Sequence, residues 1–183
     1  MSLPPFGLVS KIWVSGYDFL TSSGKKNQAL NDICSLARAN MTVLKIIINA
    51  APASDFTTAL AEARQMKANP GNFFPSPTRI QLRQPAATTT LDVASKKFDA
   101  IKSDQAFVLP ANVRDLLSSM ISTLDRYHTD YNHSLTTNSP GSFRFSRCLR
   151  LHDAMIDLHD SARLGLPERH RKRFGPQTRN RII

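Results

Sequence analysis

The feature that most constrains the fold is an apolar stripe at helical spacing, which begins just after Pro110. Its members recur at helical intervals: Val113, Leu116, Leu117, Met120, Ile121 and Leu124. This pattern places them on one side of an α-helix, and that side must be buried against other elements. The stripe therefore predicts a helix that starts near Pro110, where a proline is well tolerated, and packs on further helices.

Similar periodicity predicts further helices along the chain. The predicted segments are 27–40, an apolar segment at 41–51 that Pro52 stops and for which helix is favoured over strand, a third helix capped by Ser54 or Asp55 that ends before Asn69, and a last helix from about Phe145 to Leu164. Residues 85–103 are ambiguous, with a helix at 91–101 as one alternative.

The remaining segments are less regular. Residues 78–83 alternate in polarity, which predicts a short strand, and residues 130–141 are rich in Asn, Ser and Thr, which predicts a polar loop. We therefore expect an all-α fold, an antiparallel four-helix bundle with a small β element and extended terminal arms. It divides into an N-terminal arm (1–24), the bundle (25–167) and a basic, partly disordered tail (168–183).

The charge of the chain points to a polyanionic partner. Twenty-four Lys and Arg residues face 14 Asp and Glu residues, for a net charge of +10. Residues 144–183 contain ten of the basic residues and four of the acidic ones, so this part carries a surplus of six. Nucleic acid is the first partner to expect, and an anionic membrane surface is the second.

Composition also argues against several classes of protein. No apolar run approaches the roughly 20 residues of a membrane-spanning helix, so we expect no stable membrane insertion. No charged segment precedes an apolar one at the N-terminus, so no signal peptide is expected. Cys34 and Cys148 are far apart, which predicts neither a disulfide framework nor a metal site and favours a reducing, intracellular setting.

Three arginines near the start of the last helix form the best candidate site. Arg144, Arg147 and Arg150 are spaced by three residues, and Asp153 follows three residues later, where it could hold the Arg150 guanidinium. Cations at a helix N-terminus oppose the helix dipole, but a bound phosphate would reverse that penalty. The alternative interpretation is that these arginines form salt bridges between helices, for example to Asp125 or Asp130.

Other site chemistry has little support. His152 and His159 are seven residues apart without a matching carboxylate motif, so neither catalysis nor a metal site is predicted. Residues 22–26 lack the glycine spacing of a phosphate loop and are better read as a turn that begins a helix. Aromatic residues flank Arg144 and Arg126 only thinly, which favours backbone contacts over base stacking. We expect no enzyme activity and no cofactor.

Three motifs resemble the coat proteins of rod-shaped plant RNA viruses, the tobacco mosaic virus-like group. The first, Asn40-Met41-Thr42-Val43-Leu44-Lys45, is similar to the start of that family's second helix. The second, Phe74-Pro75-Ser76-Pro77-Thr78-Arg79-Ile80, resembles its Pro-Ser-Pro turn before a strand. The third, Arg150-Leu151-His152-Asp153-Ala154, resembles the run that opens its last bundle helix. Ser161 to Leu164 and Arg173-Phe174 resemble the end of that helix and the closing aromatic of the hordeivirus and benyvirus branches. The resemblance spans roughly residues 25–174.

The resemblance implies a site as well as a fold. Members of the family bind single-stranded genomic RNA at the inner ends of four antiparallel helices, through arginines and an aspartate. Carried over, Arg150 would contact phosphate, Asp153 would lie near the RNA groove, and Arg126 and Lys45 would add contacts. His152 stands where the family often has a second acid, and the basic tail departs from the type member.

We therefore expect a structural protein that polymerises into helical rods or discs around single-stranded viral RNA, largely without sequence specificity. It would be found in the virion, and in the host cytoplasm during assembly. The N-terminal arm and Phe73-Phe74 could supply apolar lateral surface, and Arg150→Ala should still fold but package little RNA.

Two alternatives remain open from the sequence. The first is a non-capsid RNA-binding accessory protein that uses the basic C-terminal tail, and deletion of residues 168–183 would distinguish it from a coat protein. The second is a membrane-associated matrix protein, against which the lack of a basic amphipathic helix counts.

Overall fold

The computed structural model describes residues 7–69, 79–81, 85–136 and 142–183, and its described part is mostly helical, as expected for an all-α protein. The long helices are α1 (Gly7–Ala50), α2 (Ala53–Ala68), α3 (Pro85–Gln105), α4 (Ala111–Leu135) and α5 (Phe145–Leu164). The short elements are the strands β1 (Arg79–Gln81) and β2 (Ser142–Arg144), the helix α6 (Glu168–Arg171) and the 3-10 turns η1 (Ala106–Val108) and η2 (Thr178–Asn180).

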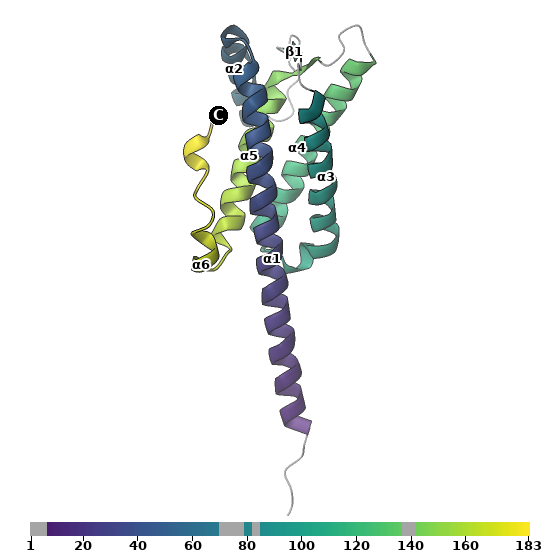
Figure 1. Cartoon of the computed structure of the whole chain (residues 1–183), viewed down its shortest axis with the longest axis vertical. Helices are drawn as coiled ribbons and strands as arrows, with labels where there is room; N and C mark the ends of the chain where they lie inside the picture. Colours follow the sequence, from purple (N-terminus) through teal and green to yellow (C-terminus); the bar gives the residue numbers. More distant parts are fainter. Residues whose placement is uncertain (1–6, 70–78, 82–84, 137–141) are drawn as a thin grey trace, which may run out of the picture.

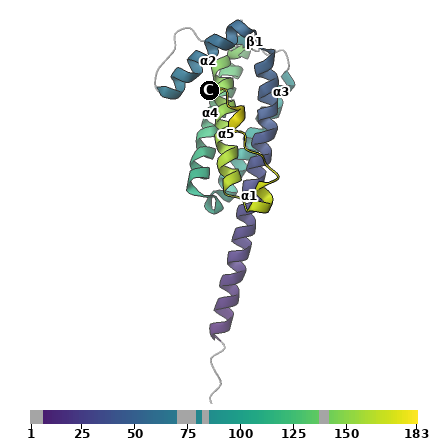
Figure 2. The same cartoon turned by 90° about the vertical axis from the view of Figure 1, so that its left-hand side faces the viewer.

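Four of the helices enclose the core. α1 packs against α3 and α5, and α4 packs against the same two helices, which closes a ring. Successive members of the ring run in opposite directions along the long axis of the molecule (Figure 1). α2 crosses one end of the ring and packs on α5 (Figure 2). The two strands pair antiparallel at that same end, with Ile80 opposite Phe143.

The apolar stripe after Pro110 is confirmed as a core-facing surface. Val113, Leu117, Met120, Ile121 and Leu124 are buried. The largest fully buried side chains come from all four helices of the ring, namely Tyr127, Phe98, Phe145, Leu30, Ile33, Leu44, Leu91, Leu117, Met120, Leu124 and Leu149. Burial of each large apolar side chain contributes about 1.5–3 kcal/mol to the free energy of folding, so this core is the main source of stability.

The prediction of two separate helices at 27–40 and 41–51 was wrong, because α1 continues through both. The apolar seam crosses the expected boundary without a change of period, through Ala37, Met41, Leu44 and Ile48, which are all buried. Asn40 does not interrupt it, since its side chain donates to the Leu36 carbonyl of the preceding turn. The motif that resembled the start of a second helix therefore lies inside one long helix.

The N-terminal arm was also expected to be irregular, but α1 already begins at Gly7. The segment at 22–26 consequently lies within this helix and is not a turn that begins one. Residues 1–6 lie outside the described part of the chain, and so do Phe73-Phe74 and the Pro-Ser-Pro motif.

The other helix predictions are confirmed with shifted ends. The ambiguous segment forms α3, which begins at Pro85, and α4 extends to Leu135, so the first half of the expected polar loop is helical. Residues 137–141 of that loop lie outside the described residues. α2 begins after Pro52, without a side-chain cap from Ser54 or Asp55. The last helix has the expected bounds, and β1 confirms the short strand.

The C-terminal tail is ordered against α5, contrary to the prediction. We call residues 168–183 the C-terminal strap, because this segment runs back along α5 from α6 (Figure 1). Phe174 is 5% exposed and meets the ring of His159 edge-on at 6.1 Å. The Asp160 carboxylate accepts the main-chain N–H groups of Gln177 and Thr178, both at 2.8 Å. These partners are 15 to 18 residues apart in sequence, so no local pattern reveals them.

One part of α1 also meets the criteria for a membrane span. Ser22–Ala50 is long and apolar enough to cross a membrane by length and composition. In this structure its apolar side, which includes Leu30 and Ile33, is part of the core. The core helix of a soluble protein passes the same test, so the length and composition of this segment are only weak evidence for a membrane span.

Candidate nucleic-acid interface

Four arginines from four different elements gather at the end of the ring that carries the strands. We call them the arginine cluster: Arg79 of β1, Arg126 of α4, Arg144 of β2 and Arg147 of α5. The strand pairing places Arg79 directly opposite Arg144. Arg147 follows in the first turn of α5, and its guanidinium donates to the main-chain carbonyl of Arg126 at 2.5 Å. The fold thus joins positions that are 68 residues apart in sequence.

One buried carboxylate lies among these arginines. Asp130 of α4 is 9% exposed and accepts the main-chain N–H of Arg144. Its other oxygen lies 3.4 Å from the Arg79 guanidinium. The alternative of inter-helix salt bridges from Arg144, Arg147 or Arg150 to Asp130 is not found among the described residues, because the guanidinium that pairs with Asp130 is that of Arg79 in β1 and Arg144 contributes its main-chain N–H. One negative charge faces four positive ones, so the cluster keeps a positive surplus.

The surplus is visible in the electrostatics of Arg147. Burial lowers the pKa of Arg147, and the neighbouring charges of Arg144, Arg126 and Arg79 lower it further, whereas Asp130 acts in the opposite direction. The guanidinium remains charged in this setting because arginine has a very high intrinsic pKa. Burial is the main cause of the lowered pKa, and the three arginines add a smaller repulsion that a bound anion would relieve.

The cluster also offers donors that the protein does not use. The Nε atoms of Arg144 and Arg147 are buried without a hydrogen-bond partner. Arg79 and Arg126 are exposed, and Arg144 is partly exposed. Guanidinium groups present paired donors that match phosphate oxygens. The exposed guanidinium groups of Arg79 and Arg126 therefore suit an oxyanion that approaches from solvent, whereas the buried Nε atoms of Arg144 and Arg147 would become donors to it only after their side chains move.

Asp153 does not hold Arg150, so this detail of the predicted site was wrong. Asp153 is 2% exposed, and one of its carboxylate oxygens lies 2.8 Å from Lys67 of α2 and 2.8 Å from Arg181 of the C-terminal strap. Arg181 also binds Asp157. The helical spacing of Asp153 is compatible with Arg150, but two cations from distant segments occupy its carboxylate instead.

In the described part of the chain, no hydrogen bond or ion pair joins the predicted site residues Arg150 and Lys45 to the arginine cluster. Arg150 is half-buried, and no hydrogen bond or ion pair joins it to another described residue. Lys45 of α1 is half-buried and lies close enough to His152 to lower the pKa of that imidazole. The structure thus unites Arg126, Arg144 and Arg147 of the predicted set and adds Arg79. Arg79 belongs to the alternating segment that predicted β1, but its pairing with β2 has no signal in the sequence.

Among the described side chains, no group of three or more His, Cys, Asp and Glu residues could hold a metal ion. His152 is fully buried, and neither of its ring nitrogens has a hydrogen-bond partner. Burial lowers the pKa of His152 to about 4, Lys45 lowers it further, and Asp153 opposes the shift. The Nδ1 atom of His159 lies 2.8 Å from the Asp160 carboxylate.

Neither cysteine thiol is a poised nucleophile. Burial raises the pKa of both the Cys34 and the Cys148 thiol, that of Cys34 to about 12.

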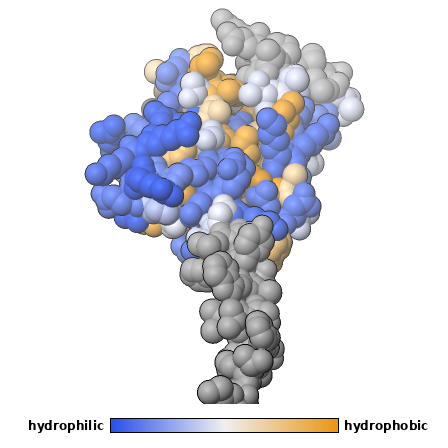
Figure 3. Space-filling model, turned by 60° about the horizontal axis from the view of Figure 1, so that its bottom comes forward, coloured by the Kyte–Doolittle hydropathy of each residue, from blue (hydrophilic) through white to orange (hydrophobic). Residues whose placement is uncertain are grey.

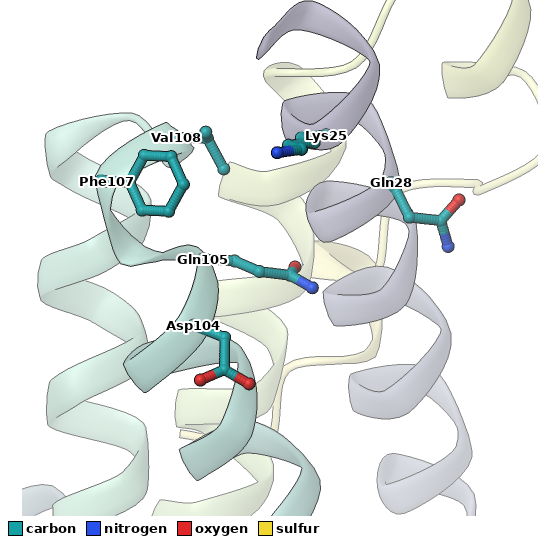
Figure 4. A pocket seen from close by; sticks show the side chains of 6 residues that line it. All are labelled: Lys25, Gln28, Asp104, Gln105, Phe107 and Val108. Atoms are coloured by element: carbon teal, nitrogen blue, oxygen red, sulfur yellow. The ribbon is translucent and has the colours of Figure 1, made fainter. Parts of the chain in front are cut away.

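A small open pocket of about 270 Å³ lies at the opposite end of the ring, between α1 and the junction of α3 and α4. Its lining residues are Lys25, Gln28, Asp104, Gln105, Phe107 and Val108 (Figure 4). Phe107 is 75% exposed. Figure 3 brings this end of the molecule forward and shows a largely hydrophilic surface with small apolar areas. The pocket offers apolar contact area but no concentration of charge.

Comparison with known proteins assigns no relative to this chain. No family model, curated protein or solved structure matches it. The functional interpretation therefore depends on the arginine cluster, on the helical architecture and on the motifs in the sequence.

Proposed function

We propose that this chain is a structural coat subunit that polymerises helically around single-stranded RNA and binds the phosphate backbone through the arginine cluster. In this proposal the ring of α1, α3, α4 and α5 is the antiparallel four-helix bundle of a tobacco mosaic virus-like coat protein. The virion and the cytoplasm of the host cell remain its expected locations. The observation that carries the proposal is the gathering of four arginines around the single carboxylate of Asp130.

The cluster favours backbone contacts over base recognition. Tyr127 and Phe145, which flank the cluster in sequence, are both fully buried, so neither offers a face for base stacking. Guanidinium groups bind phosphate regardless of the base, and this supports encapsidation of RNA with little sequence preference.

The small size of the arginine cluster supports polymerisation on RNA. A few arginines contact only a few phosphates, so a single subunit gains limited affinity, whereas neighbouring subunits on one RNA add their contacts. Exposed apolar side chains could contribute to contacts between subunits, and the described ones are Ile46, Val93, Phe107 and Leu164.

A non-capsid RNA-binding protein that uses the strap is the second candidate. Arg169, Lys172, Arg173 and Arg179 of the C-terminal strap are exposed, so this segment offers positive charge to solvent even though it is ordered. The two candidates differ in which basic group binds RNA.

Deletion of residues 168–183 no longer separates the candidates, because it would also expose the surface under Phe174 and remove Arg181 from Asp153. Matched charge variants avoid this problem. The cluster variant carries Arg126→Gln, Arg144→Gln and Arg147→Gln, and the strap variant carries Arg169→Gln, Lys172→Gln and Arg173→Gln. Both lose three positive charges, and circular dichroism checks that both fold.

Affinity for a labelled single-stranded RNA, measured by fluorescence anisotropy over a salt series, decides between them. We expect the cluster variant to lose at least tenfold in affinity, roughly 1.4 kcal/mol, and to show a shallower salt dependence, while the strap variant changes little. The opposite ranking would favour the accessory protein, and equal small losses would rule out a localised site.

A further inference from the structure

We infer that Asp130 is the positioning residue of the arginine cluster, and that its negative charge assists RNA binding although the ligand is itself an anion. This inference rests on the proposed function of the cluster. Simple charge counting predicts the reverse, because removal of an acid from a basic site should strengthen its attraction for RNA.

Asp130 contacts both strands of the small sheet. Arg79 and Arg144 occupy directly opposite positions of the antiparallel pair. Like charges in opposite positions destabilise a strand pair. Asp130 compensates for this because its carboxylate contacts both strands, through the Arg79 guanidinium at 3.4 Å and through the main-chain N–H of Arg144. The carboxylate therefore joins α4 to the small sheet.

Asp130 also contacts the residue at which α5 starts. Arg144 is the residue that precedes the first turn, and its side chain makes no capping hydrogen bond. The Asp130 carboxylate supplies a negative charge at this end of the helix, where the helix dipole favours one. It thereby fixes the turn from which Arg144 and Arg147 both project.

The charge of Asp130 also acts on Arg147. Asp130 is the one charge that raises the pKa of Arg147, against the effects of burial and of three arginines. Without Asp130, four guanidinium groups would repel one another with no described counter-charge among them. Their long side chains would then spread into solvent, and RNA would have to reassemble the cluster at an entropic cost.

The test compares two substitutions that each raise the net charge by one. Asp130→Asn keeps the size of the side chain and removes its charge. Asp125→Asn is the matched control, because Asp125 is an exposed acid on the same helix and forms no ion pair with a described residue. Asp130→Glu restores the charge and serves as a rescue variant. Thermal unfolding shows whether each protein folds.

RNA affinity over a salt series provides the first measurement, with a labelled uridine homopolymer as the probe. We expect Asp130→Asn to bind about tenfold more weakly than the wild type, with a salt slope shallower by about 0.7 for each phosphate that the cluster no longer binds. Asp125→Asn should bind as tightly as the wild type or slightly more tightly, and Asp130→Glu should recover most of the affinity. Tighter binding by Asp130→Asn would overturn the inference and make Asp130 a competitor of the phosphate.

Amide hydrogen exchange provides a second measurement that needs no RNA. Asp130→Asn should reduce the protection of the Arg144 amide and of the β1 amides, whereas Asp125→Asn should leave both unchanged. Unchanged protection in Asp130→Asn would overturn the positioning role even if the wild type binds RNA. Failure of the wild type to bind RNA would refute the proposed function, while a loss of protection would still show that Asp130 organises these residues.

Discussion

Single residues show where local spacing predicts a site and where it does not. Arg144 and Arg147 share the start of one helix, so their proximity follows from helical geometry, and the structure keeps them together. Asp153 has an equally suitable spacing from Arg150, yet Lys67 and Arg181 occupy its carboxylate. Arg79 joins the cluster only through the pairing of β1 with β2. Spacing along a helix predicts which residues share a face, but not which distant segment packs there.

His152 carries a prediction about the pH dependence of stability. Its imidazole is fully buried without hydrogen bonds, and burial lowers its pKa to about 4 from an ordinary value of 6.5. The unfolded chain therefore binds a proton at a higher pH than the folded chain does. Stability is highest above pH 6.5 and falls as the pH drops from there towards 4. The pKa of His159 is lowered in the same direction, again mainly by burial.

We predict that the wild type is about 2 kcal/mol less stable at pH 5 than at pH 8 because of His152 alone. His152→Leu should remove most of this difference at little cost at pH 8, because the imidazole forms no hydrogen bond that leucine would break. Urea unfolding of both proteins at the two pH values measures the effect. An equal pH dependence in the variant would assign it to other groups.

At the scale of elements, the helices are the part of the fold that the sequence predicts best. The stripe of α4 and the seam of α5 each repeat over several turns, and both helices form where the pattern places them. The predicted boundary after Asn40 was wrong, since α1 continues through this residue. Asn40 has a low helix propensity, but the apolar seam on either side of it outweighs one such position. The order in the C-terminal strap could not be predicted, since it depends on Asp153, Asp157 and Asp160 accepting partners from a remote segment.

Asp153 also links three elements, and this gives a prediction for their coupling. Lys67→Met or Arg181→Met alone should cost about 1 kcal/mol or less, because the other cation still neutralises the buried carboxylate. The double variant should cost about 3 kcal/mol, more than the sum, because it leaves a buried charge without a cation.

Urea unfolding of the two single variants and the double variant measures this coupling. Lys172→Met is the control, since its pair with Glu168 is fully on the surface and should contribute almost nothing. Additive costs would mean that α2 and the strap bind to α5 independently.

At the scale of the whole molecule, the positive charge falls into two groups. The arginine cluster lies at the end of the ring that carries β1 and β2, whereas the strap, which carries further exposed cations, runs back along α5 from α6 (Figure 1). The strap neutralises acids of α5 through Arg181, so part of its charge serves to hold the fold together. Under the proposed function, this division would place the RNA site at one end of the bundle.

Electron microscopy of the purified protein, mixed with single-stranded RNA and then treated with nuclease, tests the central claim most directly. We predict rods of uniform diameter that contain RNA protected from the nuclease, and the cluster variant should form far fewer RNA-containing rods than the strap variant. Wild-type protein that binds RNA only as monomers or dimers, with the RNA left open to digestion, would contradict the proposed coat function.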